Sequence, residues 1–117
     1  MDVKNTIKSN NDIDRLFKTG RKITTNSIIA LVAENIDGRD HCGRVAFVAG
    51  KKLGSAPIRN KAKRRMREVA RLKGVPFQRK DLVLIARPST TRINFNDLLK
   101  DMSLIVQRII TSERGTQ

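Results

Sequence analysis

The residues of this chain whose types and spacing indicate a function are Lys and Arg residues that cluster in one stretch. The stretch from Lys51 to Lys73, KKLGSAPIRNKAKRRMREVARLK, holds ten Lys or Arg and one acid, Glu68. It therefore carries nine of the fourteen net positive charges of the 117-residue chain. Ammonium and guanidinium groups at this density repel one another, and a polyanion such as a nucleic acid offsets that repulsion. An ordinary solvated helix face would mix signs and use acid–base pairs four residues apart.

A single helix would present these groups on one side. Ser55 or Ala56 is a suitable start, Pro57 suits the first turn, where its missing N–H is not needed, and Gly74 is a typical end. On a wheel of about 100° per residue, the apolar residues fall within roughly 160° and Arg65 lies at their edge. The stripe expected to dock on a core consists of Ile58, Ala62, Met66, Val69, Ala70 and Leu72. The face expected to meet a ligand consists of Asn60, Lys61, Lys63, Arg64, Arg67 and Arg71.

No catalytic or metal-binding constellation accompanies this helix. His41 and Cys42 are adjacent, but the chain has no second His and no second Cys, whereas a zinc site needs three or four ligands. No Gly-rich phosphate loop is present. Acids such as Asp12 and Asp97 fall where helices are expected to begin. We therefore expect neither an active site nor a metal site in the protein itself.

Size and composition restrict the class of protein. We expect residues 1–117 to form one domain, with an ordered core of about 10–111, because 38% of the residues are hydrophobic and fall in periodic segments. A net charge of +14 leaves RNA, DNA or an anionic membrane as partners, and no apolar run is long enough to cross a bilayer. One cysteine fits the reducing cytoplasm. With four Phe and no Tyr or Trp, base stacking is expected to be a minor theme.

Hydrophobic periodicity predicts seven elements in the order αβββαβα. The first helix begins at Asn10 or Asn11 and ends near Lys18, and the last carries an apolar stripe from Phe95 to Ile110. The strands are expected at residues 21–25, 27–33, 43–50 and 81–87, and the basic helix precedes the fourth strand. This order is typical of an α+β fold in which helices pack on a single sheet.

The basic stretch also resembles a known family. The run Lys51-Lys52-x-Gly54-x-Ala56-x-x-Arg59-Asn60-Lys61-x-Lys63-Arg64-x-x-Arg67-Glu68 is similar to the signature of the bacterial ribonuclease P protein subunit. The likeness extends through Phe17-x-x-Gly20 and the strand ending at Pro88, and covers about residues 12–110. It implies a two-layer α-β sandwich, a ribosomal-protein-like fold with a left-handed β-α-β crossover. The sequence itself would favour the common right-handed connection.

The resemblance implies a ribonucleoprotein whose RNA subunit performs the chemistry. That enzyme, ribonuclease P, removes the 5′ leader of precursor tRNA by hydrolysis that depends on Mg²⁺, which the RNA binds. By matching positions, the residues implied to hold the catalytic RNA are Arg59, Asn60, Lys61, Lys63, Arg64 and Arg67. Those implied to contact the leader are Ile13, Phe17, Leu31, Lys51 and Lys52.

Several positions depart from the family pattern. Ile13 and Leu31 stand where family members commonly have aromatic residues, and Pro57 replaces an aliphatic one. Each missing ring is expected to weaken stacking on the leader by about 1–3 kcal/mol. Ile13 and Leu31 are equally compatible with a purely core role.

Two other classes of protein share parts of this pattern. A structural ribosomal protein would use the same basic helix on ribosomal RNA, but the spacing of the motif and the lack of long basic tails favour the ribonuclease P subunit. A helix-turn-helix DNA regulator needs a short helix just before the basic one. The segment there, GRVAFVAG, is predicted to be a strand, so DNA is not an expected partner.

Overall fold

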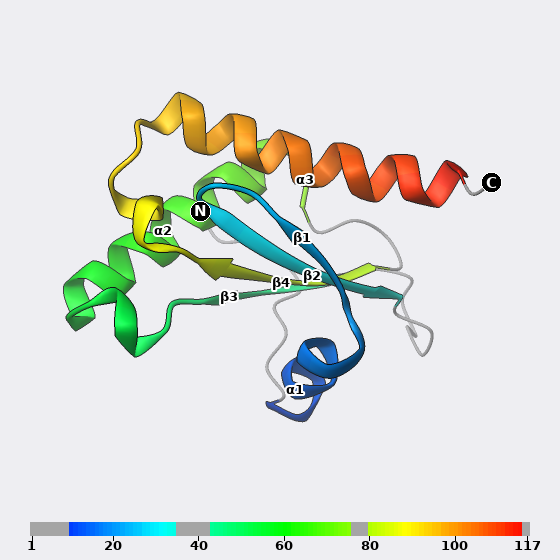
Figure 1. Ribbon diagram of the computed structural model, residues 1–117, viewed down its shortest axis with the longest axis horizontal. Helices are drawn as coiled ribbons and strands as arrows, with labels where there is room; N and C mark the ends of the chain where they lie inside the picture. The colour runs from blue at the N-terminus through cyan, green and yellow to red at the C-terminus, as the bar shows by residue number, and fades with distance from the viewer. Residues whose placement is uncertain (1–9, 35–42, 76–79, 116–117) are drawn as a thin grey trace.

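The computed structural model describes residues 10–34, 43–75 and 80–115, which fold around one four-stranded sheet (Figure 1). The predicted order of helices and strands is confirmed. The elements are α1 (Asn10–Thr19), β1 (Arg21–Thr24), β2 (Ile28–Glu34), β3 (Arg44–Val48), α2 (Ala56–Leu72), β4 (Lys80–Ala86) and α3 (Phe95–Gly115). Two short 3-10 helices were not predicted as such: η1 (Lys51–Leu53) and η2 (Pro88–Thr91). The pair His41 and Cys42 lies outside the described residues.

The strand order in the sheet is β1-β2-β4-β3. β2 is antiparallel to β1 and to β4, whereas β3 is parallel to β4. β2 and β4 are therefore the two central strands, which explains why both are nearly continuous apolar runs. Helix α2 connects the parallel neighbours β3 and β4, so the expected β-α-β unit is present. Its left hand stays a prediction.

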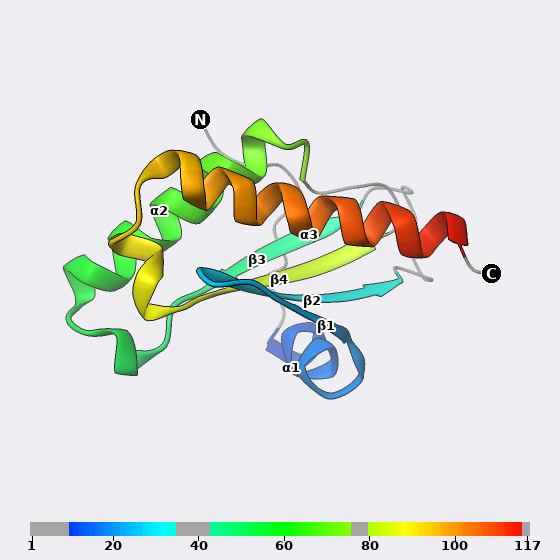
Figure 2. The same ribbon diagram turned by 45° about the horizontal axis from the view of Figure 1, so that its top comes forward.

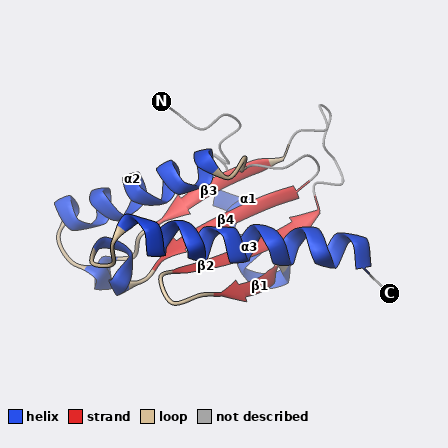
Figure 3. Ribbon diagram, turned by 90° about the horizontal axis from the view of Figure 1, so that it is seen from above, coloured by secondary structure: helices blue, strands red, loops and turns tan. Residues whose placement is uncertain are grey.

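Helices cover the two faces of the sheet unequally. α2 and α3 lie side by side on one face, and α1 lies across part of the other (Figures 1, 2 and 3). The larger core fills the space under α2 and α3 and includes Val45, Met66, Leu82, Leu84, Leu98, Met102 and Ile105. A smaller cluster under α1 consists of Leu16, Leu31, Ala46 and Val83, with partly buried neighbours. The fold is thus the expected α+β sandwich, with α1 on the reverse face.

A buried carboxylate links α1 to the beginnings of β3 and β4, which lie side by side. Asp81 is fully buried and accepts hydrogen bonds from the backbone N–H of Arg44 at 3.1 Å and from two guanidinium nitrogens of Arg44 at 3.3 and 2.8 Å. A guanidinium nitrogen of Arg15, on α1, lies 3.9 Å from the same carboxylate. This arrangement places α1 over the beginning of β3.

Polar contacts position α3 against the turn between β1 and β2. The side-chain oxygen of Asn94 accepts the N–H of Asp97 at 2.9 Å and thereby caps the beginning of α3. The N–H and hydroxyl of Ser27 donate to Asp101 at 3.1 and 2.6 Å. The hydroxyl of Thr90, in η2, donates to the carbonyl of Ser27 at 2.5 Å. No helix in the described segments is long and apolar enough to cross a membrane.

Candidate nucleic-acid interface

The side of α2 that docks on the sheet is narrower than the sequence predicts. Its buried residues are Ala62, Met66, Val69 and Ala70. Ile58 and Leu72, which are expected in the same stripe, are 42% and 48% exposed, so that part of the prediction is wrong. Both lie about 80–120° around the helix from Met66, where a side chain reaches the flank of the contact and not its centre.

Arg65 is a structural residue on the flank of α2 that faces η2. Its two terminal nitrogens donate hydrogen bonds to the backbone carbonyls of Thr90 at 2.7 Å and Ile93 at 2.8 Å. These bonds tie the middle of α2 to the connection between β4 and α3. The sequence places Arg65 at the apolar edge, separate from the expected RNA-binding residues, and its position in the structure agrees with that separation.

Most of the expected RNA-binding residues of α2 point to the outside. Asn60, Lys61 and Arg64 are exposed and Lys63 is partly exposed. Within the described part of the chain, no ion pair engages the three cations among them. Glu68, the single acid of the basic stretch, pairs with Arg71 at 2.5 Å near the end of the helix. The cations of the outer face are therefore available to a polyanion.

Arg59 and Arg67 differ from the other residues of this set. The guanidinium of Arg67 stands over the ring of Phe47 on β3, 5.5 Å from its centroid. The side chain of Arg67 therefore packs against the edge strand of the sheet. The Nε of Arg59 is buried and has no hydrogen-bond partner in the described segments, although the residue as a whole keeps some exposure. The sequence gives no sign that Phe47 supports Arg67, since the alternation of Phe47 with Val45 signals only an inward-facing residue.

The residues expected to contact a leader fall in two places. On α1, Phe17 is 50% exposed and Ile13 is partly buried, while Leu31 beneath it is only 5% exposed. The burial of Leu31 supports its core role. Lys51 and Lys52 are exposed in η1, which follows the far end of β3. Arg15 of α1 lies near Asp81 at the beginning of β4, and the cluster under α1 extends to Val48, the last residue of β3, whereas the two lysines follow beyond that end of the strand.

No metal-binding group is visible in the described segments. They contain no cluster of three or more His, Cys, Asp or Glu side chains that is able to hold an ion. Asp81, the buried acid, is already bound by Arg44. The exposed Lys and Arg side chains of the described residues are suited to binding phosphates.

The fold and this face define a class of protein: a small basic α+β domain in which the helix of a parallel β-α-β unit presents a strongly cationic surface. The sequence pattern of the Ribonuclease P family matches residues 1–110. The chain therefore belongs to the ribonuclease P protein family.

Individual relatives support the same assignment. The ribonuclease P protein component of Natranaerobius thermophilus is 32% identical over 104 residues, which is 88% of each chain. That of Streptococcus pyogenes is 31% identical and covers 93% of this chain and 89% of its own. Among solved structures, the RNase P protein of Staphylococcus aureus superposes with a TM-score of 0.77 at 26% identity, covering 92% of this chain and 96% of its own. The RNase P protein of Thermotoga maritima gives 0.74 at 28% identity, covering 90% and 97%.

Proposed function

We propose that this protein binds the catalytic RNA of ribonuclease P through the outer face of α2 and assists removal of the 5′ leader from precursor tRNA. The observation that carries the proposal is the separation of the two sides of α2. Its docking side is buried against the sheet, while Lys61, Lys63 and Arg64 on its outer side have no acidic partner among the described residues, and only Arg71 near the end of the helix pairs with Glu68. Binding of such a face to RNA is favourable because its Lys and Arg side chains displace the counterions condensed around the phosphates.

The outer face of α2 has the side chains needed to hold folded RNA. Arg64 and Arg67 present planar guanidinium groups that can bind a phosphate with two hydrogen bonds, and Lys61 and Lys63 act as point charges. Asn60 offers both a donor and an acceptor to a phosphate or a base edge. Because all of these groups project from one rigid helix, RNA binding requires little ordering of the protein.

The reverse face of the sheet is the proposed site for the leader of precursor tRNA. Phe17 offers one exposed ring for stacking, and Ile13 contributes apolar surface beside it. Lys51 and Lys52 would bind phosphates of the same strand, provided that it runs along the length of β3 between the two places. With a single ring exposed on α1, affinity for the leader should depend more on charge than on stacking.

In this proposal the RNA subunit, and not the protein, performs the hydrolysis. Mg²⁺ would be held by RNA phosphates, since the described residues offer no carboxylate cluster to bind it. The protein places a positive surface between two RNAs that otherwise repel each other, and it thereby lowers the Mg²⁺ concentration that cleavage requires. The proposed site of action is the cytoplasm.

Cleavage of a precursor tRNA tests the function directly. The purified protein alone should leave the substrate intact, and a bacterial catalytic RNA alone should need high Mg²⁺. Together they should cleave at the mature 5′ end at low Mg²⁺. Cleavage by RNA-free protein at that position, or no effect of the protein on the RNA, would contradict the proposal. In the second case a structural ribosomal-type RNA-binding role would be the better interpretation.

A further inference from the structure

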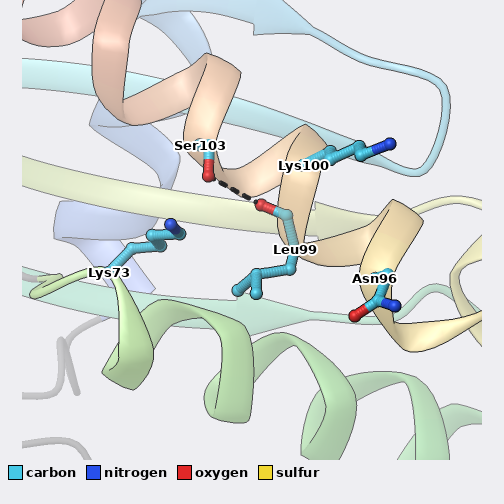
Figure 4. Close-up of a pocket in the computed structure, with 5 residues that line it drawn as sticks. All are labelled: Lys73, Asn96, Leu99, Lys100 and Ser103. Atoms are coloured by element: carbon cyan, nitrogen blue, oxygen red, sulfur yellow. Dashed lines mark hydrogen bonds between the residues drawn. The ribbon is translucent and has the colours of Figure 1, made fainter.

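A groove between α2 and α3 lies apart from the residues assigned so far. It has a volume of about 320 Å³ and is lined by Lys73, Asn96, Leu99, Lys100 and Ser103 (Figure 4). Lys73 directly follows the last residue of α2, and the other four lie on the first half of α3. We propose that this groove binds one nucleotide unit of the catalytic RNA, with its phosphate on Lys73. The inference rests on the proposed function, which it extends from the outer face of α2 to α3.

The charge of the groove favours an anion. Two of its five lining residues are lysines and none is acidic. Neither Lys73 nor Lys100 forms an ion pair in the described segments, and Asp97, three residues before Lys100, does not pair with it. Lys73 extends from the end of α2 into the space beside Leu99 and Ser103, whereas Lys100 extends along the outer side of α3 (Figure 4). Lys73 is therefore the inner phosphate contact, and Lys100 adds positive potential at the rim.

The remaining lining residues suit a sugar and base better than an isolated ion. Leu99, which is partly buried, provides an apolar surface between the polar ends of the groove. The side-chain amide of Asn96 forms no hydrogen bond within the described segments and is able to bind a base edge or a phosphate. The hydroxyl of Ser103 donates to the carbonyl of Leu99 at 3.0 Å, so it is not a free donor. A volume of about 300 Å³ is at the lower end for ligand sites and is consistent with a single nucleotide.

The position of the groove gives the RNA a continuous path. Arg65 and its carbonyl partners lie on the flank of α2 that faces η2, and Arg67 with Phe47 lies on the opposite flank, toward β3. The groove is on the α3 side, at the C-terminal end of α2. A strand bound to Arg64 on the outer face can therefore continue past the end of α2 into the groove without crossing the structural contacts of Arg65.

The test is the salt dependence of binding to the catalytic RNA. The double variant Lys73→Gln with Lys100→Gln should bind more weakly, and its slope of log affinity against log salt should be smaller by about one unit, because one phosphate is no longer bound. The matched control, Lys18→Gln with Arg108→Gln, removes two exposed charges outside the groove and should change the slope less. Ser103→Phe fills the groove without changing its charge and should also weaken binding, with thermal melts confirming that each variant is folded.

The other possible results distinguish a failure of the groove proposal from a failure of the proposed function. If the groove variants bind like the unmodified protein while Arg64→Gln binds more weakly, the groove proposal is wrong and the proposed function stands. If Arg64→Gln is also without effect, the proposed function itself fails. Equal reductions of affinity in the groove and control pairs, with Ser103→Phe unchanged, would indicate general electrostatics and overturn the site.

A titration with inorganic phosphate separates RNA from small anions. Amide signals of Lys73 and Lys100 that shift with phosphate, while RNA affinity is the same with and without the groove charges, would assign a small-anion site and overturn the RNA proposal. If the site is part of the RNA interface, the RNA should shift the same signals, and Ser103→Phe should abolish those shifts.

Discussion

The guanidinium of Arg67 stands 5.5 Å from the centre of the Phe47 ring, so a residue of the proposed RNA-binding face is supported by the edge strand of the sheet. This contact holds the side chain in place before any RNA binds. It also makes Arg67 a residue with two roles, since the same guanidinium contacts the protein and is offered to a phosphate.

Arg67→Ala should therefore lower both stability and RNA affinity. A cation–π contact at a partly exposed site contributes about 0.5–1 kcal/mol, so the melting temperature should fall by a few degrees. Relief of repulsion among the neighbouring cations should offset part of that decrease. Asn60→Ala is the matched control, because this exposed residue should weaken RNA binding without changing the melting temperature. Equal melting temperatures for Arg67→Ala and the unmodified protein would contradict a net stabilising role of Arg67, because the Phe47 contact would then contribute no more than the relief of repulsion.

Arg65→Ala should lower the stability of the domain without weakening RNA binding. It removes two hydrogen bonds from a charged donor to backbone carbonyls and leaves Thr90 and Ile93 without these partners. We expect a decrease of about 2–3 kcal/mol in the free energy of unfolding, measured by denaturant titration. RNA affinity measured well below the melting temperature should change little. A stable variant with strongly weakened RNA binding would instead move Arg65 into the RNA interface.

Met66 and Leu72 test how α2 is oriented on the sheet. Met66 is fully buried, so Met66→Asp places an unpaired charge in the core and should unfold the domain at a cost of several kcal/mol. Leu72 is 48% exposed, and Leu72→Asp should change stability by no more than about 0.5 kcal/mol. Circular dichroism melts of the two variants suffice. A severe loss of stability in Leu72→Asp would restore the wider stripe that the wheel predicts.

Hydrophobic periodicity captures the order of the elements and the burial of the central strands. The order follows from apolar runs and turn residues, and both central strands are recognisable from runs without alternation. The wheel finds the four buried residues of α2 but overestimates the stripe, because it assigns a direction to each side chain without knowing where the partner surface ends. Ile58 and Leu72 lie beyond the edge of that partner surface and are exposed, although the wheel includes them in the stripe.

Long-range contacts are the features that the sequence could not predict. The roles of Arg65 and Phe47 depend on which loop and which strand lie beside α2, and the separation of Lys51 from α1 depends on how α1 lies on the sheet. The groove between Lys73 and α3 likewise exists only once the two helices pack side by side. No local pattern encodes these juxtapositions.

The affinity for the catalytic RNA should depend steeply on salt. If about six cations of α2 contact phosphates, log affinity should fall with log salt with a slope of about five units. Arg64→Gln should reduce that slope by about one unit, because it removes one phosphate contact from the exposed face. Filter binding from low to physiological salt measures the slope. An affinity that is the same throughout this range would contradict an interface based on phosphate contacts.

The buried carboxylate of Asp81 should couple the position of α1 to leader binding. Asp81→Asn replaces the acceptor of three Arg44 hydrogen bonds with an amide whose NH₂ group cannot accept, and it removes the charge that faces Arg15. Since both guanidinium groups are partly exposed, we expect a decrease of about 2–3 kcal/mol in stability, below the full value for a buried pair. Asp14→Asn, at an exposed site beside Arg15 on α1, is the control and should have little effect.

A functional readout separates this coupling from a general loss of stability. When α1 is held less firmly, Phe17 moves away from the reverse face of the sheet, while α2 on the other face keeps its position. Asp81→Asn should therefore bind the catalytic RNA with normal affinity at temperatures where it is folded. The holoenzyme that contains it should lose part of its preference for precursor tRNA with a leader over mature tRNA. Equally weakened binding of both RNAs would mean that Asp81 stabilises the domain as a whole and does not position α1 for the leader.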